Sequence, residues 1–137
     1  MGNIDALRDW GHAKDYVRMM WMILQADKPE DWVIATGETT TVRDFIKLVF
    51  RYVGVEVEFK GKGVSEVGIV SKVSNNSYEF KIGQLVVSVD SKYFRPTEVE
   101  SLQGDFRKAK KILNWKPKIG IKDLVKEMIN NELKNDQ

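Results

Sequence analysis

The seven residues 31–37, DWVIATG, constrain the fold more than any other stretch of this 137-residue chain. Their centre is apolar on both faces, and the run ends at Gly37. Such a run is typical of an inner strand in a covered, parallel-type sheet. An inner strand needs a neighbouring strand on each side, and the chain contains few candidates. The sequence therefore predicts an α/β protein whose sheet is completed by a part that this chain lacks.

A helix is expected over residues 12–25, ahead of that run. Apolar side chains recur there at three- and four-residue spacing. We expect them to form one helical stripe, made up of Ala13, Tyr16, Val17, Met20 and Leu24, with Trp21 and Ile23 widening it. His12 is expected to begin this helix and not to act as a catalyst.

The clearest helix follows the run. Thr41 and Asp44 have the spacing of a capping box, and Gly54 stands where a helix typically ends. The alternating residues 55–59 then predict a half-buried strand. Residues 60–92 combine a glycine-rich loop with three β-prone runs, VGIVSKV, YEFKI and QLVVSVD. We expect a two- or three-stranded β-rich excursion there.

Two more helices are expected near the end of the chain. The first spans about 105–114, with Asp105 as its cap, and the second spans about 121–134. The residues of the second helix that we expect to face inward are Leu124, Val125, Met128 and Ile129. The whole order of elements is that of an α/β protein with a βαβ-like start and a helical end.

Composition excludes several classes of function. Apolar residues make up 42% and charged residues 31%, which indicates a folded domain. The net charge is only +2 and the densest basic run, RKAKK, is short, so we expect no nucleic-acid partner. There is no cysteine and only one histidine, so we expect no metal site. No apolar run is long enough for a membrane span or a signal core, and we expect a cytoplasmic protein.

The common catalytic and nucleotide-binding motifs are absent. The nearest approach to a dinucleotide-binding loop is Gly61-Lys62-Gly63, and Glu66 stands where the third glycine belongs. There is no P-loop, and the carboxylates form no paired motif. The chain by itself therefore contains no complete catalytic constellation.

Two arginine-centred stretches remain. Arg8 precedes the first helix, and Arg95 stands before Pro96 with Glu98 three residues on. Proline holds the preceding residue extended, arginine matches phosphate oxygens with two parallel donors, and a carboxylate can accept from both hydroxyls of a ribose. The spacing therefore suits a clamp for a nucleoside diphosphate. A surface ion pair is the commoner use of such a pattern, and Asp9 beside Arg8 can simply favour the helix dipole.

Three long segments carry a resemblance to a known family. GNIDALRDWGHAKDYVRMMWMILQ, DWVIATGETTTVRDFIKLVF and VDSKYFRPTEVESLQGDFRKAKKILNWKP together resemble the carboxyl-terminal part of the GDP-mannose 4,6-dehydratases. The stretches RDWGHAKDYV, VIATGE and KYFRPTEV are the most specific. These enzymes belong to the extended short-chain dehydrogenase/reductases, within the NAD-dependent epimerase/dehydratase superfamily. The segment GIVSKVSNNSYEFKIGQLVVSVD resembles a β-rich insertion of bacterial members.

The resemblance implies a fold and a reaction. The fold would be the substrate-binding part of a Rossmann-type enzyme, with the β-rich insertion at about 60–92. Residues 1–37 would give a helix and a strand to the cofactor-binding sheet, and residues 38–137 would form the substrate-binding domain. The full enzyme would be a lyase that uses NADP to oxidise C4 of GDP-mannose, eliminate water across C5 and C6, and return the hydride to C6. The product, GDP-4-keto-6-deoxymannose, would serve GDP-fucose synthesis.

The resemblance also implies which residues bind substrate. Arg8 and Arg95 would hold the diphosphate, Glu98 would hold the ribose, and Asn3 is a further candidate because it lies close to the Arg8 segment. The family's Tyr-x-x-x-Lys does not occur, because the fourth residues after the four tyrosines are Met20, Glu56, Ile82 and Thr97. We therefore expect no catalytic or cofactor-binding residue on this chain, and no activity from it alone.

Two other functions remain open. One is a free-standing, non-catalytic module that binds GDP-sugars. The other is an assembly partner in which Trp10, Trp21 and Val33 are exposed and pack against another chain. That other chain would be a second copy, giving a homo-oligomer, or the missing amino-terminal part.

Overall fold

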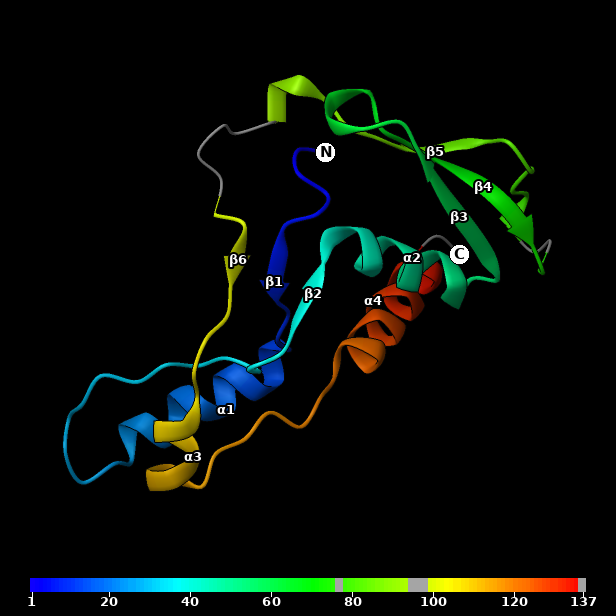
Figure 1. Ribbon diagram of the computed structural model, residues 1–137. Coiled ribbons are helices and arrows are strands. Elements are labelled where there is room, and N and C mark those ends of the chain that lie inside the picture. Colours follow the sequence, from blue (N-terminus) through cyan, green and yellow to red (C-terminus); the bar gives the residue numbers. More distant parts are fainter. Residues whose placement is uncertain (76–77, 94–98, 136–137) are drawn as a thin grey trace. The chain divides into compact units, whose positions relative to one another are not determined.

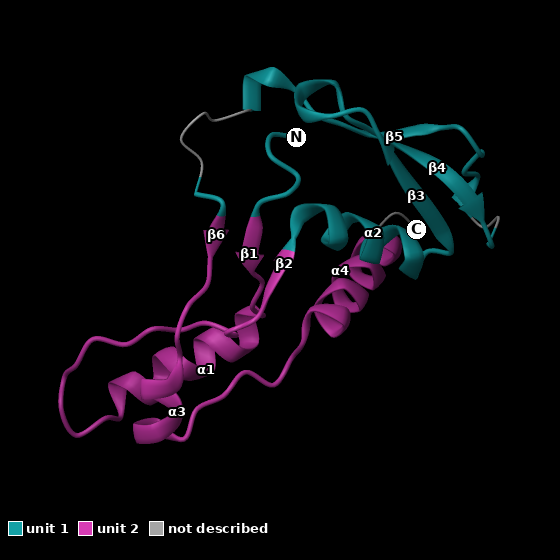
Figure 2. Ribbon diagram, in the orientation of Figure 1, with its two compact units in different colours: residues 1–6, 41–100 teal, residues 7–40, 101–137 magenta. Residues whose placement is uncertain are grey.

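The structure, a computed structural model, describes residues 1–75, 78–93 and 99–135 (Figure 1). It confirms the mixed α/β class. The chain forms two compact units, and each is built from two separate stretches (Figure 2). Unit 1 comprises Met1–Ala6 and Thr41–Glu100, and unit 2 comprises Leu7–Thr40 and Ser101–Gln137.

Unit 1 is a helix and a three-stranded antiparallel sheet of order β3-β4-β5. Its elements are α2 (Val42–Tyr52), β3 (Val55–Lys60), β4 (Val67–Val73), β5 (Leu85–Ser88) and two single turns of 3-10 helix, η1 (Gly63–Ser65) and η3 (Ser91–Tyr93). The capping prediction is confirmed, because the Thr41 hydroxyl accepts from the backbone N–H of Asp44 at 2.9 Å and begins α2. Gly54 follows the end of α2 with a φ of +79°, a conformation that favours glycine.

The sheet of unit 1 buries one face, as its alternating sequence predicts. Val55 and Val57 of β3 pack with Val70 of β4, while Glu56 and Glu58 are exposed. Of the expected β-prone runs, VGIVSKV became β4 and part of QLVVSVD became β5. YEFKI forms no strand in the part of the chain that the structure describes. Glu79 adopts a φ of 55°, which cannot continue an extended ladder.

Unit 2 contains the second sheet, of order β2-β1-β6, and three helices. Its elements are β1 (Leu7–Asp9), α1 (Ala13–Leu24), β2 (Thr39–Thr41), β6 (Ser101–Leu102), α3 (Arg107–Leu113) and α4 (Ile121–Asn135). The pair of β1 and β6 is parallel, with Leu7 opposite Ser101 and Arg8 opposite Leu102. Two segments more than ninety residues apart are thereby joined side by side (Figure 1).

The core of unit 2 forms around Trp115. Trp115 and Met19 are completely buried, and Ala109 of α3 packs with them. The Trp115 indole N–H donates to the Asp15 carbonyl at 3.2 Å, and its ring meets Phe106 edge-on at 5.8 Å. A residue in the linker between α3 and α4 therefore ties the first helix of the chain to the third.

The helix at 12–25 is confirmed, but the predicted stripe does not form one buried face. Tyr16 and Ile23 pack with Met19 against the core, while Val17, Met20, Trp21 and Leu24 are exposed. The helix is apolar on two sides, so its periodicity alone cannot show which side meets Trp115.

The predicted strand at 31–37 is also not observed. These residues are described, and none belongs to a strand (Figure 1). Both edges of β1 are already taken, by β2 and by β6. Trp32 and Ile34 pack against the unit 2 core instead.

Two smaller expectations at the end of the chain need correction. Phe106, not Asp105, is the residue that precedes the first turn of α3, although the Asp105 carboxylate accepts from the backbone N–H of Arg107 at 2.9 Å. In α4, Val125 is buried as expected, whereas Met128 is 51% exposed. No helix among the described residues is long and apolar enough to cross a membrane.

Candidate functional site

Arg8 lies on the central strand of the unit 2 sheet. The strand β1 holds it between β2 and β6, and it is half-buried. Its guanidinium donates from Nη1 to the Leu7 carbonyl at 2.8 Å. A contact with a backbone carbonyl orients the planar guanidinium.

The strand beside Arg8 is β6, which follows the other predicted clamp residues in the sequence. Arg95 and Glu98 lie outside the described residues, and β6 begins three residues after Glu98. The register that sets Arg8 opposite Leu102 therefore brings the Arg8 strand next to the chain that leaves the Arg95 segment. Their roles in binding stay predictions.

Asn3 belongs to unit 1 and is used locally. Its Oδ1 accepts from the backbone N–H of Asp5 at 2.9 Å. It also lines a cavity of about 50 Å³, together with residues that include Gly63 and Glu66. That volume holds a few water molecules and is too small for a sugar nucleotide. The proposed contact of Asn3 with substrate stays a prediction.

A partly buried ion cluster lies beside Asn3. Arg43 donates from Nη1 and Nη2 to the two carboxylate oxygens of Glu66, and from Nε to Asp5 at 2.9 Å. Its guanidinium also lies 4.8 Å above the ring of Phe59. The hydrogen bonds that Arg43 donates to Glu66 are the largest cause of the raised pKa of Arg43. With two carboxylates bound, Arg43 is a structural cation and a poor candidate for gripping phosphate.

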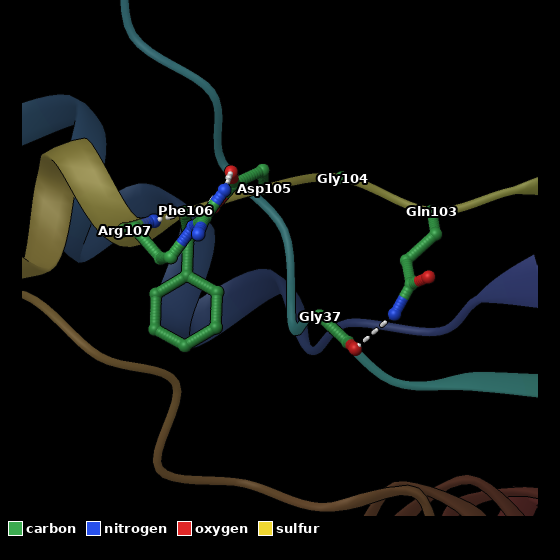
Figure 3. Close-up of a pocket in the computed structure, with 6 residues that line it drawn as sticks. All are labelled: Gly37, Gln103, Gly104, Asp105, Phe106 and Arg107. Carbon is green, nitrogen blue, oxygen red and sulfur yellow. Dashed lines mark hydrogen bonds and ion pairs between the residues drawn. The ribbon is translucent and has the colours of Figure 1, made fainter.

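An open pocket of about 380 Å³ lies where β6 leads into α3 (Figure 3). It is lined by Gly37, Gln103, Gly104, Asp105, Phe106 and Arg107. Gln103 donates from Nε2 to the Gly37 carbonyl, and Arg107 grips the Asp105 carboxylate from Nη2 at 2.6 Å. The bonds from Arg107 lower the pKa of Asp105 to about 2, so this pair is ionised on both sides at neutral pH.

The Asp9 carboxylate connects the Arg8 strand to that pocket. It accepts from the Thr36 hydroxyl at 2.6 Å, from the Thr36 backbone N–H at 2.9 Å and from the Gly37 backbone N–H at 2.9 Å. Asp9 therefore binds the 36–37 turn. This corrects the expectation that Asp9 simply favours the dipole of the first helix. The signal for this arrangement in the sequence is a combination of two features: an acid directly after Arg8, and a Thr-Gly pair that ends an apolar run.

His12 begins α1, as expected. Its Nδ1 accepts from the backbone N–H of Lys14 at 3.0 Å, which leaves the proton of the neutral ring on Nε2. That Nε2 lies 3.3 Å from Glu127 of α4. Lys14 donates to the same carboxylate at 2.8 Å and, with His12, holds the pKa of Glu127 below its usual range. Both ring nitrogens of His12 therefore make structural contacts: Nδ1 caps the start of α1, and Nε2 faces Glu127 of α4.

Tyr16 stands in the next turn of α1 and covers Gly11. A Cβ added at Gly11 would lie 2.0 Å from the Tyr16 hydroxyl oxygen, so the glycine permits this close approach. Burial, followed by the negative charges of Asp9 and Asp15, raises the pKa of Tyr16. The phenol therefore remains protonated at neutral pH.

The glycine-rich loop at Gly61 and Gly63 does not have the geometry of a dinucleotide cradle. Gly61 and Gly63 follow β3, which is antiparallel to β4, and lead into a single turn of 3-10 helix. A dinucleotide cradle needs a parallel strand that leads into the N-terminus of a full helix. Among the described residues, no group of three or more metal-ligating side chains is found either.

Comparisons with known proteins agree on one family. A family model described as GDP-mannose 4,6 dehydratase matches residues 1–128. The GDP-mannose 4,6-dehydratase of Yersinia enterocolitica is 51% identical over 97% of this chain and 36% of the relative. That of Vibrio cholerae serotype O1 is 52% identical over 100% of this chain and 37% of the relative. The chain thus spans little more than a third of the length of the curated relatives it matches.

A solved structure shares the fold. RMD from Pseudomonas aeruginosa, complexed with NADPH, has a TM-score of 0.59 and 18% sequence identity, over 91% of this chain and 32% of that chain. At this identity the likeness concerns the fold alone.

Proposed function

This chain belongs to the GDP-mannose 4,6-dehydratase family, and we propose that it forms the carboxyl-terminal, substrate-binding part of such an enzyme. In the whole enzyme, GDP-mannose would be converted to GDP-4-keto-6-deoxymannose in the cytoplasm, as a step towards GDP-fucose. NADP would be held by the part of the enzyme that this chain does not include. The absence of Tyr-x-x-x-Lys from the sequence supports the expectation that the chain alone is inactive.

In this proposal the chain's own task is to hold the GDP end of the substrate. Arg8 and Arg95 bind the diphosphate by charge-assisted hydrogen bonds, and Glu98 accepts from the ribose hydroxyls. Asn3 is the fourth proposed contact. The observation that carries the proposal is the parallel pairing of β1 with β6, because it links the Arg8 strand to the chain leaving the Arg95–Glu98 segment.

A calorimetric titration of this chain with GDP tests the proposal. We expect a dissociation constant no tighter than roughly tens of micromolar, because two arginines would supply only a few charge-assisted hydrogen bonds. UDP should bind more weakly. Arg95→Ala should weaken GDP binding at least about tenfold, the loss of one charge-assisted contact. Arg51→Ala, at an exposed arginine of α2, is the matched control and should bind as the wild type does.

Three results would contradict the clamp. They are equal binding of GDP and UDP, an unchanged affinity in Arg95→Ala, and no binding by a chain that circular dichroism shows to be folded.

The alternative of a non-catalytic GDP-sugar-binding module predicts tight and specific binding by this chain in the same titration. The two are separated by adding the rest of a relative's chain together with NADP and GDP-mannose. Formation of the 4-keto product favours the enzyme part, and binding without turnover favours the module. The exposed apolar side of α1 favours the assembly-partner alternative, in which the partner is a second copy or the missing part.

A further inference from the structure

We propose that Arg43 is a positioning residue for the GDP site, and that it acts on Asn3 through Asp5. All three residues belong to unit 1. The proposal rests on the proposed function, since Asn3 is there a contact of the substrate. It adds which group of Asn3 faces the substrate and which residues fix that group.

The Asn3 side chain is oriented by one hydrogen bond. Its Oδ1 accepts from the backbone N–H of Asp5 at 2.9 Å, which closes a short turn of the Asx type. Because the partner is a donor, the oxygen of the amide and not its nitrogen lies on Asp5. The Nδ2 group can only donate, so it is the end of the side chain that would meet a phosphate or hydroxyl oxygen of GDP.

Arg43 holds the turn that makes this bond. Its Nε donates to Oδ1 of Asp5 at 2.9 Å, and its Nη2 lies 2.8 Å from the same oxygen. The backbone N–H of Arg43 also donates to the Ile4 carbonyl at 2.8 Å. That N–H lies in the first turn of α2 and has no acceptor inside the helix. One residue therefore binds both the side chain and the backbone of the Asn3 turn.

The Arg43 side chain is in turn anchored on the sheet. Its Nη1 and Nη2 donate to the two carboxylate oxygens of Glu66, which is only 8% exposed. Glu66 directly precedes β4, and the guanidinium lies 4.8 Å above the ring of Phe59 in β3. A planar guanidinium can bind two carboxylates and stack on a ring, whereas an ammonium is a point charge. Arg43 therefore fixes the position of Asp5 relative to β3 and β4.

The bond from Arg43 to Asp5 has little to do with holding the fold together. The Asp5 side chain is 68% exposed, and an exposed ion pair adds little to the free energy of folding. Residues 2–5 also line a cavity of about 50 Å³ together with Gly63, Glu66 and Val89, so this side of the turn is not closely packed. Polar contacts therefore determine where Asn3 points.

The test is a double-mutant cycle on GDP binding, measured by calorimetry. Asp5→Ala removes the bond from Arg43 but keeps the backbone N–H that binds Asn3. We expect the affinity for GDP to fall about three- to tenfold, although the loss of a negative charge should by itself favour an anionic ligand. Asn3→Ala should weaken binding at least as much. The double variant should bind no more weakly than Asn3→Ala, because Asp5 acts through Asn3.

Glu56→Ala is the matched control. Glu56 is an exposed acid of unit 1 that pairs with Lys72 of the neighbouring strand at 3.3 Å. Its replacement removes the same charge from the same unit, and it should not weaken GDP binding. Chemical denaturation should give the Asp5 and Glu56 variants the stability of the wild type.

A second measurement needs no ligand. Arg43→Lys keeps the positive charge but not the planar fork of donors. Hydrogen exchange of the Asp5 amide, followed by NMR, should become at least about threefold faster in this variant. Exchange of the β3 amides should not change, which separates release of the Asn3 turn from a general loss of structure.

Three outcomes would overturn the proposal. They are an unchanged affinity for GDP in Asp5→Ala or Asn3→Ala, independent effects of the two changes in the double variant, and unchanged exchange of the Asp5 amide in Arg43→Lys. If Arg95→Ala weakens binding while Asp5→Ala does not, the clamp stands and this inference fails. If the folded wild-type chain does not bind GDP, the clamp fails, and the exchange measurement still decides whether Arg43 holds the Asn3 turn.

Discussion

The Asp9 carboxylate and the Thr36 side chain form a direct hydrogen bond of 2.6 Å, although the two residues are 27 positions apart. The same carboxylate also accepts from two successive backbone N–H groups, those of Thr36 and Gly37. A single side chain thus links the end of β1 to the 36–37 turn, which lies beyond α1 in the sequence. The conformation of the Arg8 strand is thereby coupled to one wall of the pocket at Gly37.

Removal of that carboxylate should destabilise unit 2. Asp9→Ala leaves two backbone N–H groups without their acceptor, and we expect the free energy of unfolding to fall by about 1–3 kcal/mol. Thr36→Val removes only the hydroxyl and should cost about 1 kcal/mol. Chemical denaturation monitored by circular dichroism measures both. Asp27→Ala, at an exposed position, serves as the control, and equal stability of the Asp9 and Asp27 variants would refute the role of Asp9.

His12 should behave as a helix cap in mutagenesis. His12→Ala removes the acceptor for the Lys14 N–H and should lower the free energy of unfolding by about 1 kcal/mol. His12→Asn supplies another acceptor and should recover most of that loss. Both variants should bind GDP as the wild type does. A loss of GDP binding in His12→Asn, with stability retained, would show that the imidazole has a different function.

Position 104 needs a glycine because its backbone lies against the Ala35 side chain. A Cβ added at Gly104 would lie 2.2 Å from the Ala35 Cβ, well inside contact distance. Gly104→Ala should therefore cost about 1–3 kcal/mol of stability. Ala35→Gly removes the opposing methyl group, so the double variant should be more stable than the sum of the two single changes predicts. Strict additivity in thermal denaturation would mean that the two residues do not meet.

Tyr16 should make stability depend on alkaline pH. Its pKa is raised in the folded state, so between the unfolded and folded pKa values the unfolded chain binds fewer protons than the folded chain. Stability from this group is complete below about pH 10 and falls as the pH rises above it. Tyr16→Phe should remove part of the loss seen as the pH rises above about 10. Tyr52→Phe, at an exposed tyrosine, should not. A wild-type chain with no greater alkaline loss than Tyr16→Phe would contradict this prediction.

Features encoded by neighbouring residues were predictable from the sequence. The Thr41 cap, the glycine at position 54 and the alternation of β3 each depend on a few adjacent residues, and the structure has all three. The position of His12 at the start of α1 belongs to the same class. Such signals describe local backbone geometry, which tertiary packing here did not override.

Features that depend on distant partners were not predictable. The buried side of α1 is set by Trp115, about a hundred residues away, and the 31–37 run joins no strand among the described residues. The pocket at Gly37 depends in the same way on a hydrogen bond from Gln103, 66 residues on. Of the predicted site, the setting of Arg8 and Asn3 is described, whereas Arg95 and Glu98 lie outside the described residues.

Each of the two units is built from two separate stretches of the chain. This limits how pieces of the chain can be exchanged between family members. The chain passes from one unit to the other after Ala6, after Thr40 and after Glu100. In unit 1 the backbone N–H of Val42 donates to the Ala6 carbonyl at 3.2 Å, so the two ends that flank residues 7–40 already meet. A recombination event could therefore replace residues 7–40 as a cassette with its junctions intact. A chimera would keep the Trp115 core matched only if residues 101–137 came from the same parent.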